Sequence, residues 1–415
     1  MTSISSSRQN TSTASANNGQ QPSNKKKVYV GMSGGVDSSV SAALLKQQGY
    51  DVTGVFIKVW QPDSTDCGWK DERRDAMRVC AVLDIPFLTF DFSEKYKKEV
   101  VDYMIAEYKA GRTPNPDIMC NRHVKFGSFL DEAKARGIDY VATGHYAQRA
   151  YDETTKTWVL QEGADKNKGQ SYFLWTLGPA DLERALFPIG HLQKSQVRAL
   201  AKELGLPVFD KKDSQGVCFI GHLDMKAFLK EYIQTKPGNV LDSKGEIIGE
   251  HDGAVLYTLG ERHGFRIFTE STAREPHYIV KKDIASNSLV VLPESEYKAG
   301  ASAAADAHRT GSGQDVSVQP AQTISIQSCL FTPALLERLK DATSGSGANP
   351  LAGQTLACDV RIRYRQTRQA CTISDVDMVA GTAKVTFEQR QLAMAPGQSA
   401  VFYIDETCIG GGILV

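Results

Sequence analysis

The sequence predicts an α/β protein in which a doubly wound parallel sheet is followed by a small β-rich domain and a C-terminal β-barrel. From about residue 25 to residue 147, apolar β-type runs alternate with helical runs. That rhythm is typical of a parallel sheet with helices on both faces. After residue 232 the helical pattern gives way to short alternating runs bounded by glycine turns, which favour antiparallel strands. A chain of 415 residues is long enough for two or three such domains.

The elements of the parallel sheet follow one another in a regular order. Strands are predicted at 28–30, 52–57, 87–90 and 140–142. Helices are predicted at 40–48, near 71–83, at 94–110 and near 125–136. Each strand is short and apolar, and each helix is long enough to cross over a sheet, as parallel pairing requires.

The second half of the chain supplies the remaining strands. Strand candidates lie at 245–249, 278–280 and 289–292, and then at 356–364, 383–387 and 400–404. We therefore expect a leader at 1–26, a catalytic α/β domain at 27–231, a central β-rich domain at 232–299, a flexible insertion at 300–322 and a barrel at 323–415. A second Ser/Gly-rich insertion is expected at 344–353.

Composition restricts the partners and the compartment. Lysine plus arginine (48) balance aspartate plus glutamate (48), so a nucleic-acid surface has to be a local patch. No apolar run approaches the roughly 18 residues of a membrane span, so no membrane partner is expected. Eight cysteines without a Cys-x-x-Cys pair indicate a reducing compartment. The Ser/Thr/Asn/Gln-rich leader is expected to be disordered and is compatible with a mitochondrial transit peptide; in a bacterium the location would be cytoplasmic.

Residues 31–38 have the pattern of a phosphate-binding loop. The segment Gly-Met-Ser-Gly-Gly-Val-Asp-Ser lies between a predicted strand and a predicted helix. Its small residues let backbone N–H groups surround phosphate oxygens, and the helix N-terminus favours an anion there. No Gly-Lys-Ser/Thr is present, so this is not the loop of kinases and GTPases and suits pyrophosphate better. Asp37 is a candidate magnesium ligand, and an ordinary strand-to-helix turn is the alternative.

A second candidate site combines a carboxylate and a thiol. Pro114 and Pro116 exclude a helix through this point and fix a shaped loop. Asp117 and Cys120 then lie one helical turn apart, on one face. A helix N-terminus lowers the pKa of a thiol, so Cys120 is a candidate nucleophile and Asp117 a candidate base. A buried structural cysteine is the alternative.

Two further segments suggest sulfur chemistry and RNA. Cys218 follows Lys211 and Lys212 in a glycine-bounded stretch, an electropositive setting that favours a thiolate. In residues 361–365, Arg-Ile-Arg-Tyr-Arg, strand alternation would place three guanidiniums on one face, spaced to meet phosphates. A solvated barrel face is the alternative for this second pattern.

Seven sequence motifs, in the same order along the chain, resemble those of the tRNA-specific 2-thiouridylases, a family of adenylating pyrophosphate-loop ATPases. The resemblance covers about residues 27–414 and is carried by residues 33–38, 113–121 (Thr-Pro-Asn-Pro-Asp through Cys-Asn), 142–146 (Ala-Thr-Gly-His-Tyr), 170–174 (Gln-Ser-Tyr-Phe-Leu), 216–221 (Gly-Val-Cys-Phe-Ile-Gly), 363–366 (Arg-Tyr-Arg-Gln) and 396–402 (Pro-Gly-Gln-Ser-Ala-Val-Phe). The resemblance implies that ATP, with magnesium, adenylates the C2 oxygen of the wobble uridine in tRNA. Sulfur from a persulfide then replaces that oxygen, giving 2-thiouridine, AMP and pyrophosphate.

The resemblance also assigns roles by position. Cys218 would carry the persulfide, Cys120 would be the nucleophile that closes a disulfide with it, and Asp117 would assist at the base. ATP contacts would fall on Gly31, Met32, Ser33, Gly34, Gly35, Val36, Asp37, Ser38, Ile57 and Gly144. Contacts with tRNA would fall on Asn115, Pro116, Asp117, His145, Lys168, Gly169, Gln170, Arg363, Tyr364 and Gln398.

Three residues of this chain differ from the family pattern. Ile57 stands where the family has methionine, Gly169 stands where it has aspartate, which removes a side chain, and Gln215 replaces the usual threonine before the second cysteine.

The expected partners are the tRNAs for Lys, Glu and Gln and a sulfur donor, either a desulfurase or a relay protein. Two other functions are considered: an adenylating ATPase with another acceptor, such as an amidating synthetase, and a catalytically silent RNA-binding protein. An iron–sulfur cluster on Cys120 and Cys218 is disfavoured by the absence of local Cys-rich spacing.

Overall fold

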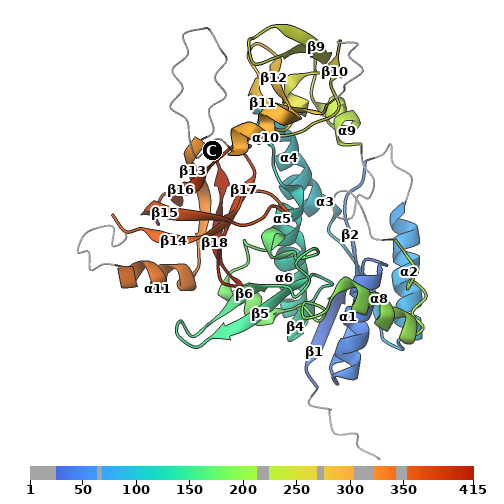
Figure 1. The fold of residues 1–415 in the computed structure, drawn as a ribbon. Coiled ribbons are helices and arrows are strands. Elements are labelled where there is room, and N and C mark those ends of the chain that lie inside the picture. The colour runs from blue at the N-terminus through green and yellow to red at the C-terminus, as the bar shows by residue number, and fades with distance from the viewer. Residues whose placement is uncertain (1–24, 63–67, 213–223, 269–274, 303–320, 343–352) are drawn as a thin grey trace, which may run out of the picture.

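Three sheets organise the protein, as Figure 1 shows for the computed structural model. The structure describes residues 25–62, 68–212, 224–268, 275–302, 321–342 and 353–415. A parallel sheet is built by the first half of the chain, a small mixed sheet lies at the top of the view, and a large antiparallel sheet lies at the left. The predicted fold class is confirmed.

The parallel sheet has the strand order β3-β2-β1-β4-β7. Its strands are β1 Lys27–Gly31, β2 Asp51–Lys58, β3 Phe87–Asp91, β4 Tyr140–Ala142 and β7 Ala185–Leu186. Side chains alternate between the two faces of β1: Val28 and Val30 pack on one side, whereas Tyr29 stacks on Phe129 on the other. The chain order reverses between β1 and β4, and ligands of open α/β sheets bind at the carboxyl ends of strands at such a point.

Helices cover both faces of this sheet. The helices of the first half are α1 Val36–Gln47, α2 Gly68–Val82, α3 Ser93–Tyr96, η1 Lys97–Asp102, α4 Tyr103–Lys109, α5 Pro116–Cys120, η2 Asn121–Ser128, α6 Phe129–Ala135, η3 Ser171–Phe173, α7 Pro179–Arg184 and α8 Lys194–Glu203. The helix predicted near 125–136 starts earlier, because Pro116 is well placed at a first helical position. The segments η1 and η2 are π-helical, which sequence periodicity did not predict, and π-helices are frequent at functional sites.

The mixed sheet has the order β10-β9-β8-β12-β11. Its strands are β8 Gly238–Leu241, β9 Ile247–His251, β10 Arg266–Ile267, β11 His277–Asp283 and β12 Ser288–Pro293; its helices are α9 Met225–Tyr232, η4 Ala254–Leu256 and α10 Glu294–Ser302. Most of the predicted insertion at 300–322 lies outside the described residues, and so does most of the one at 344–353.

The large sheet closes into a barrel because β13 pairs with both β16 and β18. Its strands are β13 Ala321–Phe331, β14 Leu356–Arg361, β15 Gln369–Asp377, β16 Thr382–Gln391, β17 Ser399–Ile404 and β18 Thr407–Leu414, with helix α11 Pro333–Ala342 alongside. Two further strands, β5 Ala147–Asp152 and β6 Thr157–Glu162, come from the first half of the chain, and β6 pairs with β18. We predicted no element at 147–162. This hairpin joins the barrel firmly to the α/β part.

None of the described helices is long and apolar enough to cross a membrane.

Candidate active site

The loop at residues 31–38 connects the carboxyl end of β1 to α1. The backbone N–H of Ser33 donates to Ser38 Oγ (3.2 Å), and the N–H of Gly35 donates to Ser33 Oγ (3.4 Å). Gly34 has a φ of +70°, and a Cβ there would collide with the carbonyl oxygen of Glu72. Only glycine satisfies both conditions. The loop is thus held in one shape by its own hydroxyls and by α2.

Gly144 brings the end of β4 against the same loop. A Cβ on Gly144 would lie 2.7 Å from the backbone nitrogen of Ser38 and 3.0 Å from Asp37 Cβ. The predicted ATP residues 31–38 and Gly144 therefore lie together, at the point where the strand order reverses. Ile57 lies near them but is buried in the core (2% exposed), as is Met32.

Asp37 has two strong partners from distant parts of the chain. Lys194 Nζ lies 2.7 Å from Asp37 Oδ1 and 2.8 Å from Oδ2, and the Tyr146 hydroxyl donates to Oδ1 (2.9 Å). Among the described residues, no group of three His, Cys, Asp or Glu side chains is arranged to hold a metal. Mg²⁺ at nucleotide sites is usually held by one or two carboxylates together with substrate phosphates and waters, so Asp37 alone is compatible with such a site. In this structure Asp37 is paired with Lys194, and its role as a magnesium ligand stays a prediction.

A second lysine fixes the loop from another side. Lys211 Nζ donates to the carbonyl oxygen of Gly34 (3.0 Å) and to Asp75 Oδ2 (2.8 Å). Burial raises the pKa of Glu72 despite the opposing charge of Lys211. The chain that leads toward Cys218 therefore starts beside the phosphate-binding loop. Cys218 itself lies outside the described residues.

The predicted carboxylate and thiol occur on helix α5. Asn115 caps this helix, its side chain accepting the N–H of Ile118 (3.3 Å), and Pro116 occupies the first helical turn. Asp117 and Cys120 follow within the same five residues, as predicted. Cys120 is fully buried and carries no disulfide.

The predicted activation of Cys120 by the helix terminus is wrong for this structure. Burial, reinforced by the charge of Asp117, raises the pKa of Cys120 to about 12, although Lys125 acts in the opposite direction. Cys120 is the last residue before η2, and the i, i+5 spacing of a π-helix places Lys125 one turn further on. Desolvation outweighs the helix terminus because the thiol has no contact with water.

His145 lies between this helix and the nucleotide loop. Its Nδ1 is 2.7 Å from Thr143 Oγ1, and its ring lies 6.2 Å from that of Phe126. Burial, together with the charge of Lys125, lowers the pKa of His145 well below its ordinary value, so the imidazole is neutral. His145 is next to Gly144, so the segment 143–146 contacts both candidate sites.

Two residues predicted to contact tRNA, Gln170 and Tyr364, are each held by a neighbouring aromatic residue. Gln170 accepts the N–H of Tyr146 through Oε1 (2.9 Å), and its own N–H donates to the Tyr146 carbonyl (2.9 Å). The Tyr364 ring lies 4.4 Å from that of Phe173. Asn121 Nδ2 donates to the carbonyl of Phe173 (3.0 Å), which connects this aromatic group to the helix of Cys120.

The C-terminal barrel fastens the proline-fixed loop. Gln398 Nε2 donates to the carbonyls of Thr113 (2.8 Å) and Pro114 (3.3 Å). The N–H of Thr113 donates to the carbonyl of Pro396 (2.8 Å). Gly397 has a φ of +92°, and a Cβ there would lie 2.9 Å from the Thr113 carbonyl oxygen. The barrel thus positions the loop that precedes Asp117.

The predicted row of three guanidiniums is wrong. Strand β14 ends at Arg361, and Arg365 has a φ of +64°, so strand alternation stops. Arg361 pairs with buried Glu162 (2.6 Å). Arg363 donates to the carbonyls of Leu259 (2.6 Å) and Ala393 (2.5 Å), where the central domain meets the barrel.

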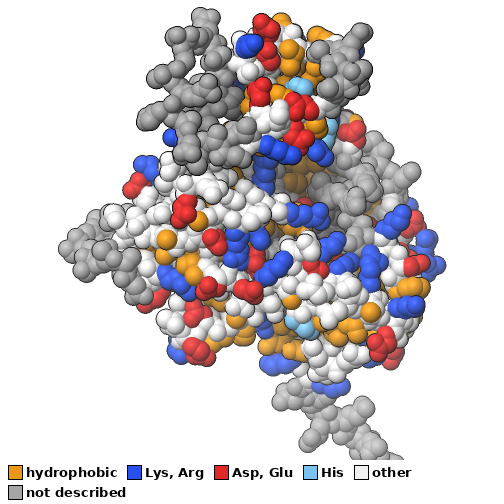
Figure 2. Space-filling view, in the orientation of Figure 1, with side chains coloured by type: hydrophobic (Ala, Val, Ile, Leu, Met, Phe, Trp, Pro, Cys, Tyr) orange, Lys and Arg blue, Asp and Glu red, His pale blue; other side chains and the backbone are white. Residues whose placement is uncertain are grey.

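Other basic side chains gather near this junction. Figure 2 shows Lys and Arg around a hollow between the central domain and the rest of the molecule. Lys168 and Gly169 lie in a turn built on Asp165, whose Oδ1 accepts the N–H of Lys168 (3.2 Å). A Cβ on Gly169 would meet only ordinary contacts. The basic patch is local, in agreement with the balanced charge of the chain.

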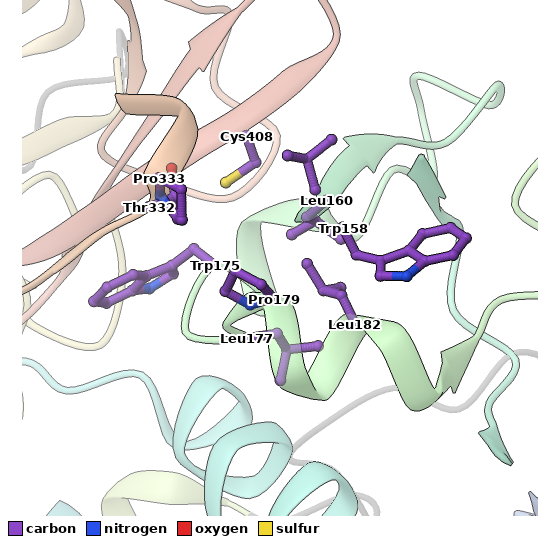
Figure 3. A pocket seen from close by; sticks show the side chains of 10 residues that line it. Trp158, Leu160, Trp175, Leu177, Pro179, Leu182, Thr332, Pro333 and Cys408 are labelled. Atoms are coloured by element: carbon purple, nitrogen blue, oxygen red, sulfur yellow. The ribbon is translucent and has the colours of Figure 1, made fainter. Parts of the chain in front are cut away.

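A small cavity lies apart from this site (Figure 3). Trp158, Trp175 and Cys408 are among its lining residues. Its volume of about 10 Å³ is close to the minimum for one water molecule. Burial raises the pKa of Cys408 to about 12. This cavity is too small for a nucleotide or a base.

Sequence reasoning missed three residues of the nucleotide site. Tyr146 was part of a quoted motif next to His145, and its place at a strand end was a usable signal. Lys211 was noted only for its proximity to Cys218. Lys194 had no local signal, because it lies 157 residues from Asp37 and only the fold brings the two together.

Fold and site together define a class: a nucleotide-binding α/β domain with a pyrophosphate-type loop, joined to a central β domain and a barrel. Three family models match in this order: "tRNA methyl transferase HUP domain" at 26–222, "tRNA methyl transferase PRC-barrel domain" at 226–293 and "Aminomethyltransferase beta-barrel domain" at 338–414. The chain belongs to the tRNA-specific 2-thiouridylase family.

Similar proteins support this membership. The chain is 42% identical over 396 residues to "tRNA-specific 2-thiouridylase MnmA" of Francisella tularensis subsp. holarctica, a match that covers 94% of this chain and 99% of the relative. A relative with the same name from Colwellia psychrerythraea is 42% identical over 393 residues, covering 94% and 95%. A solved 4-thiouridine synthetase–RNA complex with bound ATP covers half of each chain at 18% identity and a TM-score of 0.30, which is too low to carry an argument.

Proposed function

We propose that this protein is a tRNA-uridine 2-sulfurtransferase that converts a wobble uridine to 2-thiouridine. One observation carries the proposal: the segment 143–146 contacts the phosphate-binding loop through Gly144 and, through His145 and Phe126, the π-helix η2 that directly continues the helix of Cys120. A nucleotide on the loop and a base beside Asp117 would then share one site. The family models are described as methyl transferases, but a pyrophosphate loop serves ATP, which favours adenylation followed by thiolation.

ATP supplies the first step. Its pyrophosphate would lie on the backbone N–H groups of residues 31–38, with Gly144 beside it. The uridine C2 oxygen attacks the α-phosphorus, and pyrophosphate leaves. Asp117 would hold the base. Magnesium belongs to this proposal as the counter-ion that the phosphates of ATP bring from solution, because Asp37 already pairs with Lys194.

Sulfur enters in the second step. Cys218 would carry a terminal persulfide sulfur received from a desulfurase or relay protein. The Cys120 thiolate attacks the inner sulfur, a Cys120–Cys218 disulfide forms, and the outer sulfur leaves as sulfide. Sulfide then displaces AMP from the adenylated uridine. The electrons balance, because the sulfane sulfur is reduced by two electrons while the two cysteines are oxidised to the disulfide.

Binding of tRNA would use two connected groups of residues. One group lies at the start of helix α5, directly after the loop that Gln398 fastens: Asn115, Pro116 and Asp117. The other comes from segments after strand ends or in turns: His145, Lys168, Gly169, Gln170 and Tyr364. A tRNA contact by Arg363 would require its guanidinium to break its hydrogen bonds to the carbonyls of Leu259 and Ala393. The tRNAs for Lys, Glu and Gln are the proposed substrates.

An assay with purified protein, tRNA transcript, ATP and a desulfurase tests this function. We expect AMP and pyrophosphate in equal amounts and 2-thiouridine by mass spectrometry of digested tRNA. Asp37→Ala should abolish tRNA-dependent pyrophosphate release while the far-ultraviolet circular dichroism is unchanged. ADP and phosphate as products would refute adenylation, and thiolated tRNA formed with two free thiols at 120 and 218 would refute the relay.

The location belongs to the same proposal. We propose a mitochondrial location, or the cytoplasm if the source is a bacterium. N-terminal sequencing of the protein purified from its source tests it: a start near residue 27 supports import, and a start at Met1 opposes it.

A further inference from the structure

Lys194 lies at the phosphate-binding loop although its own segment has no nucleotide-binding motif. Its ammonium contacts both oxygens of Asp37, at 2.7 and 2.8 Å. The Lys194 side chain is 13% exposed and that of Asp37 is 31% exposed, so the pair is mostly buried and Asp37 is the more accessible partner. Figure 1 shows helices α1 and α8, which carry the two residues, side by side.

The fold fixes the start of helix α8 strongly. The backbone N–H of Lys194 donates to Asp165 Oδ2 (2.9 Å), and the N–H of Gln193 donates to Gln196 Oε1 (2.8 Å). The Lys194 ammonium also lies 5.8 Å from the centre of the Tyr146 ring, and the Tyr146 hydroxyl donates to the same Asp37. A long flexible side chain is thereby oriented before any ligand binds.

The chemistry of the loop creates a need for this charge. Residues 31–38 contain no lysine or arginine, so their backbone N–H groups would meet a polyphosphate without a compensating cation. In P-loop proteins a lysine within the loop meets that charge.

The other lysine at the loop has a different role. Lys211 donates to the carbonyl of Gly34 and to Asp75, and so it supports the loop backbone. Lys194 instead contacts a side chain in the first turn of α1, the helix end that favours an anion.

We propose that Lys194 is a further ATP-binding residue of this site, whose ammonium contacts the pyrophosphate part of the nucleotide on loop 31–38 and is positioned there by Asp37. This inference rests on the proposed function, since it requires ATP on that loop. Lys194 thus supplies from helix α8 the cation that the loop lacks.

Binding of inorganic pyrophosphate and of AMP, measured by titration calorimetry in EDTA, tests the proposal without any magnesium. Lys194→Met should weaken pyrophosphate binding about tenfold to a hundredfold, the value of a lost charge-assisted hydrogen bond. AMP binding should change by less than about twofold. Lys194→Arg, which keeps the charge, should retain most of the affinity. Lys202→Met, a charge removal near the other end of α8, is the matched control and should change neither ligand.

Two results would overturn the proposal. One is unchanged pyrophosphate affinity in Lys194→Met; the other is an equal loss for pyrophosphate and AMP, which marks a structural role. Lys194→Gln replaces Lys194→Met if the latter lowers the melting temperature strongly. Wild-type protein that forms AMP and pyrophosphate while Lys194→Met binds pyrophosphate normally would overturn this inference alone. Wild-type protein that forms no AMP, pyrophosphate or 2-thiouridine in the assay above would overturn the proposed function, independently of these binding results.

Discussion

Alkylation of Cys120 in the native protein should be at least about a thousandfold slower than in the unfolded chain. Burial raises the pKa of this thiol from 9.0 to about 12. At pH 8 the thiolate fraction therefore falls from about one in ten to about one in ten thousand. The side chain is also fully buried, so access slows the reaction further. Because the ionised form is disfavoured, the labelling rate should keep rising with pH and show no plateau below about pH 11.

Binding of tRNA should reverse this protection if Cys120 is the nucleophile. The proposed base-binding residues 115–117 form the cap and first turn of the same helix, and a base inserted there would displace the packing over the thiol. The Lys125 charge, one π-turn away, then lowers the thiol pKa with less opposition from desolvation. We expect the labelling rate to rise by at least about tenfold in the complex.

Mass spectrometry of peptides after timed labelling with iodoacetamide measures both rates. Cys80 is the internal control, because it is 1% exposed, its pKa is raised to about 11 by burial, and it lies under the opposite face of the sheet. Rapid labelling of Cys120 in the protein without tRNA would refute the buried thiol. Parallel increases at Cys80 and Cys120 on adding tRNA would show general opening instead of activation at the site.

Three further changes test the site. Gly34→Ala should abolish ATP binding, because the new Cβ would collide with the Glu72 backbone. Gly137→Ala is the control: Gly137 has nearly the same φ (+69°) but open space around it, so the change should lower the free energy of unfolding by only about 1–2 kcal/mol. Equal effects of the two changes would contradict the close contact at Gly34. Gln398→Ala removes donors to two loop carbonyls and should weaken tRNA binding by about 1 kcal/mol in a filter-binding assay, and no change would contradict the fastening role. Arg363→Ala should lower the melting temperature; a drop of about one in the salt slope of tRNA binding would show a phosphate contact as well.

The sequence predicted those parts of the fold whose signals are local. Alternation of strand and helix predicted the parallel sheet, and strand β4 at 140–142 has the predicted bounds. The glycines of loop 31–38 predicted its conformation, because a positive φ and a close backbone contact both exclude a side chain at Gly34. The two prolines predicted a helix start just before Asp117; the structure begins α5 at Pro116 itself, with Asn115 as its cap, so Pro116 belongs to the helix and not to the loop before it.

Features that depend on long-range contacts were not predictable. The hairpin β5–β6 completes a sheet whose other strands lie more than 150 residues later, so no pattern within 147–162 reveals its partner. Helix-terminus chemistry suggested a reactive Cys120, but its complete burial comes from packing between distant elements. The arginine row at 361–365 was wrong because strand β14 ends at Arg361 and Arg365 has a φ of +64°. Arg361 and Arg363 instead bind Glu162 and the carbonyl of Leu259, far away in the sequence.

Tyr146 connects the phosphate-binding loop to the proposed tRNA contact Gln170 by hydrogen bonds. Its hydroxyl donates to Asp37 in the phosphate-binding region, while its backbone N–H and carbonyl are both bonded to Gln170, a proposed tRNA contact. Tyr146 is 2% exposed, so it cannot shift at one end without disturbing the other. Movement of Gln170 by a bound tRNA would therefore change the position of Asp37 and of the ammonium paired with it. Under the proposed function, this connection through Tyr146 would link tRNA binding at Gln170 to the phosphate-binding loop.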